Sequence, residues 1–521
     1  MGIQNKKKNL LSSISSVMVI MVLARLMSLL STQVYMWHFG ASDVYMNIYS
    51  YVISIPNIIF TCIGTALSTV VIPIYMSHTA NGETAQAKRF ADNIITISLA
   101  LTAALVLIGI AISPLLPRFT DFGKTPETYS YATKALMIMM PVMFFYGLGY
   151  IFQGMLQAMD SYKLPAFVSV PSSLVVILYV FLFADKFGIT GLLIATVIGL
   201  SLQAIILIPP LIKKGYHYRP RFELKHPDIK NALKLTGPVL FGVSAYQLNM
   251  FYNVTMIARF EGMVTLLTYV QNIVLYMVLA IIYSITAVLY PRLTESASTN
   301  NMAQYKKDLG GILGAVCALL IPMTAGFITV REPLLRVIAQ YGNITEADIS
   351  KAAILLAAYA IGILGIGLKE ILDRAFYALQ DTKTSAVTGF IIMLINICLS
   401  LVLMQFLGAY GIPLAYSVSS LCGSAILLWR MKKKIGSFAL GFGKTLLKCI
   451  LAAGVMLGIL TLLHPYILAL GNDGILWRIL RLGAECVTGV LIYYLMALLL
   501  RITQVTDTVK NVTLKFFKRG A

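Results

Sequence analysis

An arginine lies near the middle of the first apolar run of this sequence. The stretch "VLARLMS" (22–28) places Arg25 in a segment that is otherwise apolar from about Leu10 to Trp37. A charge at the centre of a membrane span costs about 2.5–3.5 kcal/mol on insertion scales. The arginine side chain stays charged and presents a fork of donors that matches a phosphate group. We therefore expect Arg25 to bind an anionic substrate, with a capping or snorkelling arginine as the structural alternative.

A second group of charged residues lies in the stretch "GLKEILDRAFYALQDTKT" (367–384). Two helical turns of it carry Lys369, Glu370, Asp373 and Arg374. The i,i+4 spacing of Glu370 and Arg374 allows an ion pair on one helix. A structural pair near the cytoplasmic end is one interpretation of this group. The other is a coupling site, in which Glu370 or Asp373, beside Lys369, takes up a proton or a cation.

Further polar residues interrupt the apolar runs. Arg259 and Glu261 lie at the outer end of a predicted span, where we expect them at the membrane interface, with gating as the alternative. Asn47 and Asn272 belong to a set of amides that could line a polar path, although such amides also bond neighbouring helices.

These residues must be positioned by membrane-spanning helices. The 521 residues are 58% hydrophobic and only 12% charged, and uninterrupted apolar segments recur along the chain. We therefore predict an all-α polytopic membrane protein. About fourteen spans are expected, at roughly 10–37, 45–76, 91–115, 132–157, 164–184, 188–212, 235–258, 265–290, 309–330, 350–378, 385–406, 411–430, 445–465 and 480–500.

The basic residues predict the orientation. Lysines and arginines gather in the N-terminal "NKKKN", the loop 213–234, the loop 430–444 and the C-terminal "KFFKRGA", which fall on one side in this count. The positive-inside rule then places both termini in the cytoplasm. The same rule accounts for the net charge of +20 without nucleic acid as a partner. The loop 213–234 is also suited to contact anionic lipid headgroups.

The chain contains an internal repeat. Residues 69–90 resemble 287–309 at a shift of 218, and "FGITGLLIA" resembles "LGAYGIPLA" at a shift of 220, which pairs Gly188 with Gly408. Each unit holds six spans, so both units enter the membrane in the same direction. We predict an N-terminal lobe (1–234), a C-terminal lobe (235–444) and an appendix of two further helices with a cytoplasmic tail (445–521). Such a duplication favours alternating access to a substrate between the lobes.

Signatures of enzymes and of bound metals are missing from the sequence. It has no Walker A lysine loop, no HExxH motif and no large hydrophilic domain. The six cysteines are scattered singly, and the five histidines do not cluster. We therefore expect no catalytic residue, no metal and no cofactor. The driving force would be an ion gradient, the membrane potential or consumption of the substrate.

Several stretches together resemble a known family. These are "LARLMSLLSTQVYMWHFGAS", "IPNIIFTCIGTALSTVVIPIY", "EGMVTLLTYVQNIVLYMVLAIIYSITAVLYPRL" and, as the closest match, "DRAFYALQDTKTS". They are similar to the MurJ (also called MviN) family of lipid II flippases, within the multidrug/oligosaccharidyl-lipid/polysaccharide exporter superfamily. The resemblance covers nearly the whole chain. It implies fourteen spans in two lobes, a cationic central cavity and a groove from the last two spans that accepts a lipid tail.

The resemblance also implies a substrate and its site. The substrate is the undecaprenyl-linked peptidoglycan precursor, moved from the inner to the outer leaflet of a bacterial plasma membrane. Arg25 matches a family arginine. Ser31 and Asn272 stand where many members have arginines, and Asn47 stands where they have an acidic residue. We expect these four residues to bind substrate, together with Arg374, which would compensate for missing charge.

Other functions stay open at this point. A flippase for another undecaprenyl-linked glycan, such as a teichoic acid or capsule precursor, and a cation-coupled drug exporter share the expected fold. A membrane glycosyltransferase would need catalytic carboxylates and larger loops than 116–131 and 331–349. Expected partners are the lipid-linked precursor, membrane lipids and cell-wall synthesis proteins.

Overall fold

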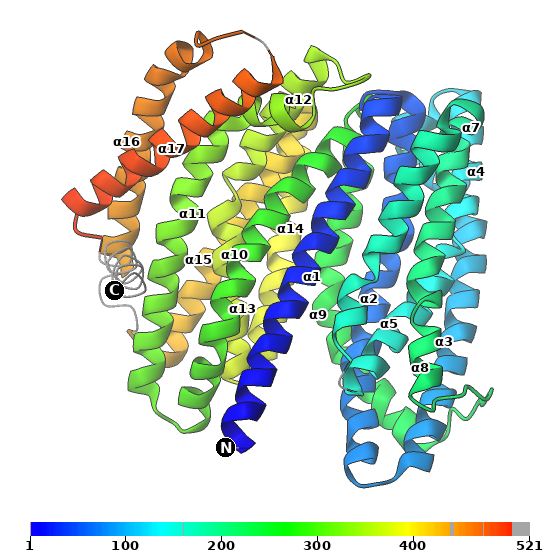
Figure 1. The fold of residues 1–521 in the computed structure, drawn as a ribbon. Coiled ribbons are helices and arrows are strands. Elements are labelled where there is room, and N and C mark those ends of the chain that lie inside the picture. Colours follow the sequence, from blue (N-terminus) through cyan, green and yellow to red (C-terminus); the bar gives the residue numbers. More distant parts are fainter. Residues whose placement is uncertain (1, 160, 438–441, 473, 503–521) are drawn as a thin grey trace. The chain divides into compact units, whose positions relative to one another are not determined.

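The computed structural model describes residues 2–159, 161–437, 442–472 and 474–502 (Figure 1). The tail after residue 502, predicted to be cytoplasmic, lies outside the described residues. Throughout the described ranges the regular structure is helical. The α-helices are α1 (Gly2–Phe39), α2 (Val44–Ala80), α3 (Thr84–Ile112), α4 (Pro126–Met139), α5 (Val142–Ala158), α6 (Lys163–Phe167), α7 (Ser169–Ile205), α8 (Ile208–Lys213), α9 (Pro227–Ile257), α10 (Val264–Ser298), α11 (Met302–Ile338), α12 (Glu346–Ala360), α13 (Ile363–Ala378), α14 (Thr382–Leu407), α15 (Gly411–Ile435), α16 (Phe442–Leu468) and α17 (Ile475–Leu499).

The predicted all-α membrane architecture is confirmed. Among the described residues, ten helical segments are long and apolar enough to cross a membrane, or eleven with α12 and α13 as one span bent by 42°. Two of these segments, Lys163–Lys213 and Thr382–Ile435, are 51 and 54 residues long, and each contains two predicted spans. The predicted span 235–258 falls on α9. Fourteen spans are therefore compatible with the helices.

Short polar side chains fix where several helices begin. The carboxylate of Asp43 accepts a hydrogen bond from the backbone N–H of Met46 at the start of α2. Thr345 and Asp348 form a reciprocal capping box at the start of α12. These side chains satisfy backbone donors that have no partner within the helix. The boundaries therefore follow from local sequence, as the N-cap rules predict.

The backbone confirms the internal repeat. Residues with positive φ recur 218 to 222 positions apart, as the pairs Gly40 and Gly262, Gly82 and Asn300, Gly188 and Gly408, and Gly215 and Gly436. Gly188 (φ 55°, ψ −151°) and Gly408 (φ 56°, ψ −135°) share a conformation that is essentially confined to glycine. Each of them turns the chain between two apolar helical segments. The match at a shift of 220 therefore has a steric cause.

The chain divides into two compact units. Unit 1 comprises Met1–Thr265 with Gly342–Ile344, and unit 2 comprises Leu266–Tyr341 with Thr345–Ala521. Unit 1 extends beyond the predicted lobe boundary at residue 234, because α9 packs against α2. The proposed moving lobes, 1–234 and 235–444, therefore stay a prediction.

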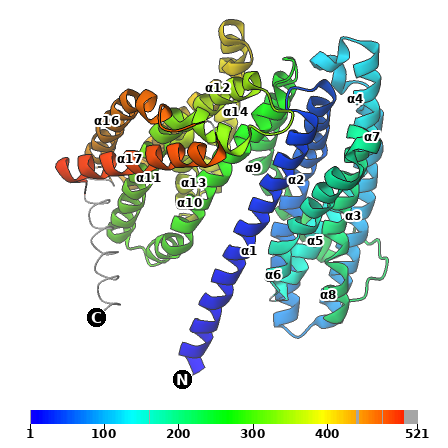
Figure 2. The same ribbon diagram turned by 45° about the horizontal axis from the view of Figure 1, so that its top comes forward.

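Each unit has its own packing. In unit 1, α2 packs against α5 and α9, and α1 packs against α6 and α7. The core where α2, α3 and α5 meet includes Phe90, Ile94, Met155 and Leu156, all nearly inaccessible. In unit 2, α15 packs against α13 and α14, and the hairpin of α16 and α17 lies against α11 (Figures 1 and 2).

Candidate functional site

Arg25 lies on an exposed face of α1. Its neighbours Val22, Leu23 and Leu26 are each about half exposed, whereas Ala24 is buried. Unit 1 thus has an exposed arginine among exposed apolar residues on a helix that is apolar enough to cross a membrane. A forked donor in such surroundings can bind a phosphate bidentately with little competition from water. Contact between Arg25 and a substrate stays a prediction.

Ser31 is buried further along the same helix. Its hydroxyl donates a hydrogen bond to the carbonyl oxygen of Ser28, 2.9 Å away, within α1. The donor of Ser31 is therefore satisfied by its own helix. Only the lone pairs of the oxygen are left for another partner in this conformation.

Asn47 has a clear structural role in unit 1. Its side-chain Nδ2 donates to the carbonyl oxygens of Ala41 (3.0 Å) and Asp43 (2.7 Å). Its Oδ1 accepts from the backbone N–H of Thr265, 3.1 Å away. Both polar atoms of this fully buried amide thus bind backbone, and they tie the first turn of α10 to α2. Substrate binding by Asn47 stays a prediction, and in this conformation it would require these bonds to open.

Arg259 and Glu261 lie just after α9 and are both exposed. The Nε of Arg259 donates to the carbonyl oxygen of Phe119 (3.2 Å), and the N–H of Asp121 donates to the carbonyl oxygen of Ala258 (2.7 Å). The loop after α3 is therefore bonded to the end of α9. This geometry suits the expected interfacial position, and gating by either residue stays a prediction.

In unit 2, α13 carries a nearly buried ion pair. Lys369 Nζ lies 2.6 Å from Asp373 Oδ2, and the other carboxylate oxygen of Asp373 accepts from Ser385 Oγ at 2.5 Å. The lysine and aspartate side chains are only 26% and 10% exposed. This i,i+4 pair lies one residue earlier on the helix than Glu370 and Arg374, the i,i+4 pair that was considered from the sequence. The structure thus brings two of the predicted coupling residues into direct contact.

The remaining candidates in unit 2 are half-buried. Glu370 and Arg374 lie on α13 beside that ion pair, and Asn272 lies on α10. Their proposed roles in coupling or substrate binding stay predictions.

The family-like motif "DRAFYALQDTKTS" forms the turn between α13 and α14. The N–H of Asp381 donates to the carbonyl oxygen of Phe376 (2.9 Å) and closes the turn. The carboxylate of Asp381 caps α14 by accepting from Thr384, and Lys434 of α15 donates to it at 2.5 Å. The motif therefore fixes three helices of unit 2 at one end.

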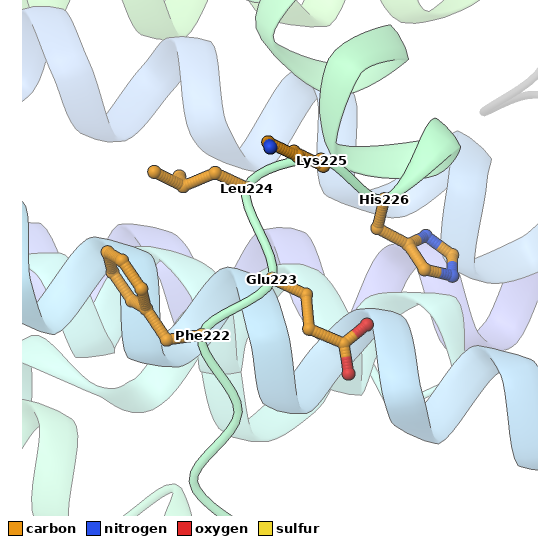
Figure 3. A pocket seen from close by; sticks show the side chains of 5 residues that line it. All are labelled: Phe222, Glu223, Leu224, Lys225 and His226. Atoms are coloured by element: carbon orange, nitrogen blue, oxygen red, sulfur yellow. The ribbon is translucent and has the colours of Figure 1, made fainter.

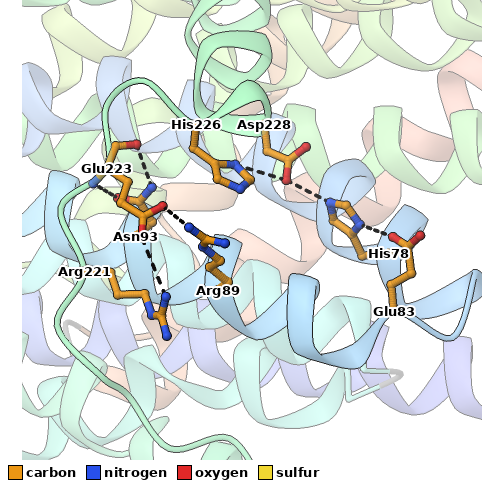
Figure 4. A network of polar contacts seen from close by, with 8 residues as sticks. All are labelled: His78, Glu83, Arg89, Asn93, Arg221, Glu223, His226 and Asp228. Atoms are coloured by element: carbon orange, nitrogen blue, oxygen red, sulfur yellow. Dashed lines mark hydrogen bonds and ion pairs between the residues drawn. The ribbon is translucent and has the colours of Figure 1, made fainter.

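Sequence reasoning missed a polar network in unit 1 (Figure 4). His78 at the end of α2 lies with Nδ1 2.7 Å from Glu83 and Nε2 3.0 Å from Asp228 of α9. The hydrogen bond to Glu83, supported by Asp228 and opposed by partial burial, raises the pKa of His78. An imidazole that donates from both nitrogens is protonated. The network joins the α2–α3 turn to the start of α9.

A further missed pair lies in the appendix helices. Glu485 of α17 is 1% exposed, and its Oε1 lies 2.6 Å from Nδ1 of His464 on α16. Its Oε2 has no hydrogen-bond partner among the described residues. A lone glutamate inside the predicted span 480–500 was the available signal.

The comparison with known families decides the identity. The model of a family described as "Lipid II flippase MurJ" matches residues 36–480. The chain belongs to the MurJ family. The predicted resemblance, the flippase function and the class of transporter rather than enzyme are therefore confirmed.

Curated relatives in the MurJ family match most of the chain. A probable lipid II flippase MurJ of Buchnera aphidicola subsp. Baizongia pistaciae is 26% identical over 487 residues, which covers 92% of this chain and 94% of the relative. The lipid II flippase MurJ of Burkholderia cenocepacia is 25% identical over 406 residues, covering 76% and 78%.

Solved structures show the same fold. The structure titled "Lipid II flippase MurJ, inward closed conformation" has a TM-score of 0.76 and 23% identity, covering 93% of this chain and 98% of that one. An inward-facing transporter of the MATE family, from the MOP superfamily, has a TM-score of 0.69 and 13% identity, covering 82% and 99%. The MurJ fold of this chain is therefore shared with drug exporters.

Proposed function

We propose that this MurJ-family chain moves lipid II from the inner to the outer leaflet by alternating access, with Arg25 binding the diphosphate. The position of Arg25, an exposed residue within an apolar surface of α1, carries the proposal. A diphosphate cannot enter hydrocarbon without compensation of its charge. Arg25 would supply that compensation, while the polyprenyl tail stays in the lipid.

The proposed route for the tail lies along α16 and α17. These helices expose large apolar side chains over much of their length, including Leu462, Val490, Leu495 and Leu499. Apolar surface of this kind suits an isoprenoid chain as well as bulk lipid. We assign the appendix helices to the lipid tail on this basis.

The orientation is part of the proposal. We place both termini in the cytoplasm of a bacterial cell, with the chain in the plasma membrane. The basic loop after α8 and the basic end of α15 support this orientation, because positively charged loops are retained inside. Cell-wall synthesis proteins are proposed partners that would supply or consume the substrate.

Coupling is proposed at Lys369 and Asp373, without a cofactor. A nearly buried ion pair contributes little net stability compared with apolar side chains of similar size. Its presence in a membrane-spanning helix therefore favours a role in transport, such as proton or cation uptake or a response to the membrane potential.

The test is replacement of Arg25 in the full chain, reconstituted in vesicles with fluorescent lipid II. Transport is the rate at which label becomes accessible to an impermeant quencher. Loss of charged hydrogen bonds worth about 1.5–3 kcal/mol predicts that Arg25→Ala slows transport about 10- to 150-fold. Arg25→Lys should retain intermediate activity, because it keeps the charge but not the fork.

Arg118→Ala is the matched control, because this exposed arginine lies in the loop after α3. We expect it to leave the rate unchanged. An Arg25→Ala protein that inserts normally and transports at the original rate would refute the role of Arg25.

A second substrate class is favoured by one observation. Asn47 is neutral, where the resemblance implies an acidic residue, and its amide is occupied by backbone. Another undecaprenyl-linked glycan therefore deserves a direct comparison in the same vesicles. Faster transport of a teichoic acid or capsule precursor than of lipid II would favour that substrate.

A further inference from the structure

The connection between α8 and α9 is an ordered strap in unit 1. We define the strap as residues 216–225. It has no regular secondary structure over most of its length, and it runs along the first turns of α3 (Figure 4). Its sequence, "YHYRPRFELK", alternates aromatic or apolar residues with polar ones that are basic except for Glu223.

Side chains of α3 hold the strap backbone at alternate residues. The N–H of Arg219 donates to Asp92 Oδ1 (3.1 Å), and that of Arg221 donates to Thr96 Oγ1 (3.1 Å). Asn93 bonds Glu223 twice: it accepts from its N–H at 2.8 Å and donates to its carbonyl oxygen at 2.9 Å. We call the three side chains that bind the strap its anchors: Asp92, Asn93 and Thr96.

Two of these anchors are buried polar residues. Asp92 is 4% exposed and Asn93 is 1% exposed, at the start of a helix that is apolar further along. Buried polar groups destabilise a fold unless they are hydrogen-bonded. Asp92 also accepts from the hydroxyl of buried Tyr216, 2.7 Å away. The hydrogen bonds to the strap therefore account for the polar residues at the start of α3.

The strap presents apolar and basic groups together. Phe222 is 60% exposed and Leu224 is 48% exposed, and both point to the same side of the chain (Figure 3). They border an open hollow of about 570 Å³ lined by residues 222–226. The basic side chains of Arg219, Arg221 and Lys225 are exposed as well.

The acidic residue of the strap is already neutralised. Glu223 pairs with Arg89 of α3 at 2.8 Å and with Arg221 at 3.6 Å. The hydrogen bond from Arg89 lowers the pKa of Glu223 and keeps it ionised. The strap therefore carries an excess of positive charge beside its exposed apolar groups.

The sequence of α3 predicts that the strap lies near the membrane interface. Its anchors are within the first thirteen residues of α3, where charged Lys88, Arg89 and Asp92 are followed by a mostly apolar stretch. Basic and aromatic residues at this depth interact with headgroups, and apolar ones reach the acyl boundary. We propose that the strap is a binding site for the headgroups of anionic phospholipids in the adjacent leaflet, which is cytoplasmic in the proposed orientation.

In this site, Arg219, Arg221 and Lys225 contact phosphate, while Phe222 and Leu224 enter the interface. The site is independent of lipid II transport, and it anchors the start of α9 to the membrane surface. Each basic group near an anionic surface adds to the attraction for that surface. Three such groups together should favour binding of an anionic over a zwitterionic lipid about a hundredfold at low salt.

The test uses Phe222→Trp as a reporter in the full chain, reconstituted in vesicles with brominated phosphatidylglycerol or brominated phosphatidylcholine at equal mole fraction. Fluorescence of the parent chain, which contains three tryptophans, is subtracted. We expect stronger quenching by the brominated phosphatidylglycerol, and weakening of that preference by salt. Addition of inorganic phosphate at constant ionic strength should not compete, which distinguishes a lipid site from a free phosphate site.

The triple variant Arg219→Gln, Arg221→Gln and Lys225→Gln should lose the preference by at least about tenfold. The matched control neutralises three exposed lysines elsewhere, Lys307→Gln, Lys383→Gln and Lys432→Gln, and should keep it. Equal quenching by both lipids, or a preference that survives the strap triple variant, would overturn the proposal. Quenching by neither lipid would place the strap in water, where an acidic protein is the alternative partner, and would also overturn it.

Discussion

The turn between α13 and α14 in unit 2 has a counterpart between α5 and α6 in unit 1. In unit 2, the N–H of Asp381 donates to the carbonyl oxygen of Phe376 at 2.9 Å. In unit 1, the N–H of Ser161 donates to the carbonyl oxygen of Leu156 at 2.8 Å, at positions 220 residues earlier. The backbone hydrogen bond of the duplicated turn is thus the same in both units.

The lysine that anchors each turn is also conserved by the repeat. Lys434 donates to the carboxylate of Asp381 in unit 2. Lys214, again 220 residues earlier, donates to the carbonyl oxygen of Met159 at 2.6 Å. One turn is therefore held by a charge pair and the other by a neutral acceptor.

The charges on the preceding helix are not shared. At a shift of 220, the positions of Lys369, Asp373 and Ser385 correspond to Gly149, Gln153 and Pro165 in unit 1. The same turn therefore forms without the ion pair of α13. In unit 1 the charges lie at other places, in the His78 network and the strap. The turn itself therefore does not require the α13 pair, and the proposed coupling role of the pair stays a prediction.

The largest effect is expected when the α13 pair is broken on one side. Asp373→Ala leaves Lys369 partly buried without its carboxylate, which should lower the free energy of unfolding by about 3 kcal/mol. Thermal or denaturant unfolding in detergent measures it. Asp185→Ala, at a side chain that is 98% exposed, is the control and should change stability by less than about 0.5 kcal/mol.

A double variant sharpens the same comparison. Lys369→Met with Asp373→Gln gives unit 2 an uncharged pair, as unit 1 has, and should restore most of the lost stability. Its transport should nevertheless lose its dependence on an ion gradient or membrane potential. Normal coupling in this stable double variant would leave the pair without the proposed role.

An intermediate effect is expected from His78 in unit 1. Its pKa is raised in the folded chain, so its stabilising contribution is complete below the unfolded value of about 6.5 and is lost as pH rises through the folded value. The stability difference between the original chain and His78→Gln should therefore shrink by about 1 kcal/mol from pH 6 to pH 9. Denaturant unfolding at several pH values tests the sign.

His217→Gln removes an exposed histidine of the strap and controls for general effects of the substitution. A difference for His78→Gln that grows toward alkaline pH would contradict the assigned network.

The smallest effect is expected at the two anchoring lysines. Lys434 is 39% exposed, and exposed ion pairs contribute about 0.2–1 kcal/mol. Lys434→Ala and Lys214→Ala should therefore destabilise the chain by similar, small amounts, measured by the same unfolding assay. A loss above about 2 kcal/mol at Lys434 alone would show that the charged turn of unit 2 depends on its lysine more than its neutral counterpart does.

Local patterns in the sequence were enough to predict much of this protein. Apolar length predicted the spans, and the glycine pair at 188 and 408 predicted the duplication, because its backbone conformation excludes side chains. The i,i+4 spacing of charged residues on α13 indicated an ion pair there. The pair considered from the sequence was Glu370 with Arg374, whereas the structure shows Lys369 with Asp373. In each case the determining feature is local, because it depends on helix geometry or on the backbone conformation of a single residue.

Contacts between distant residues were decided only by tertiary structure. Asn47 was predicted to line a polar path or to bond a neighbouring helix, and the structure shows it bound to the backbone of Thr265, 218 residues away. His78 meets Asp228 and Glu485 meets His464 across separate helices, and the strap is held by α3. The chemistry of an amide or a carboxylate determines which hydrogen bonds it can make. Which partner it has depends on how whole helices pack, and no local spacing contains that information.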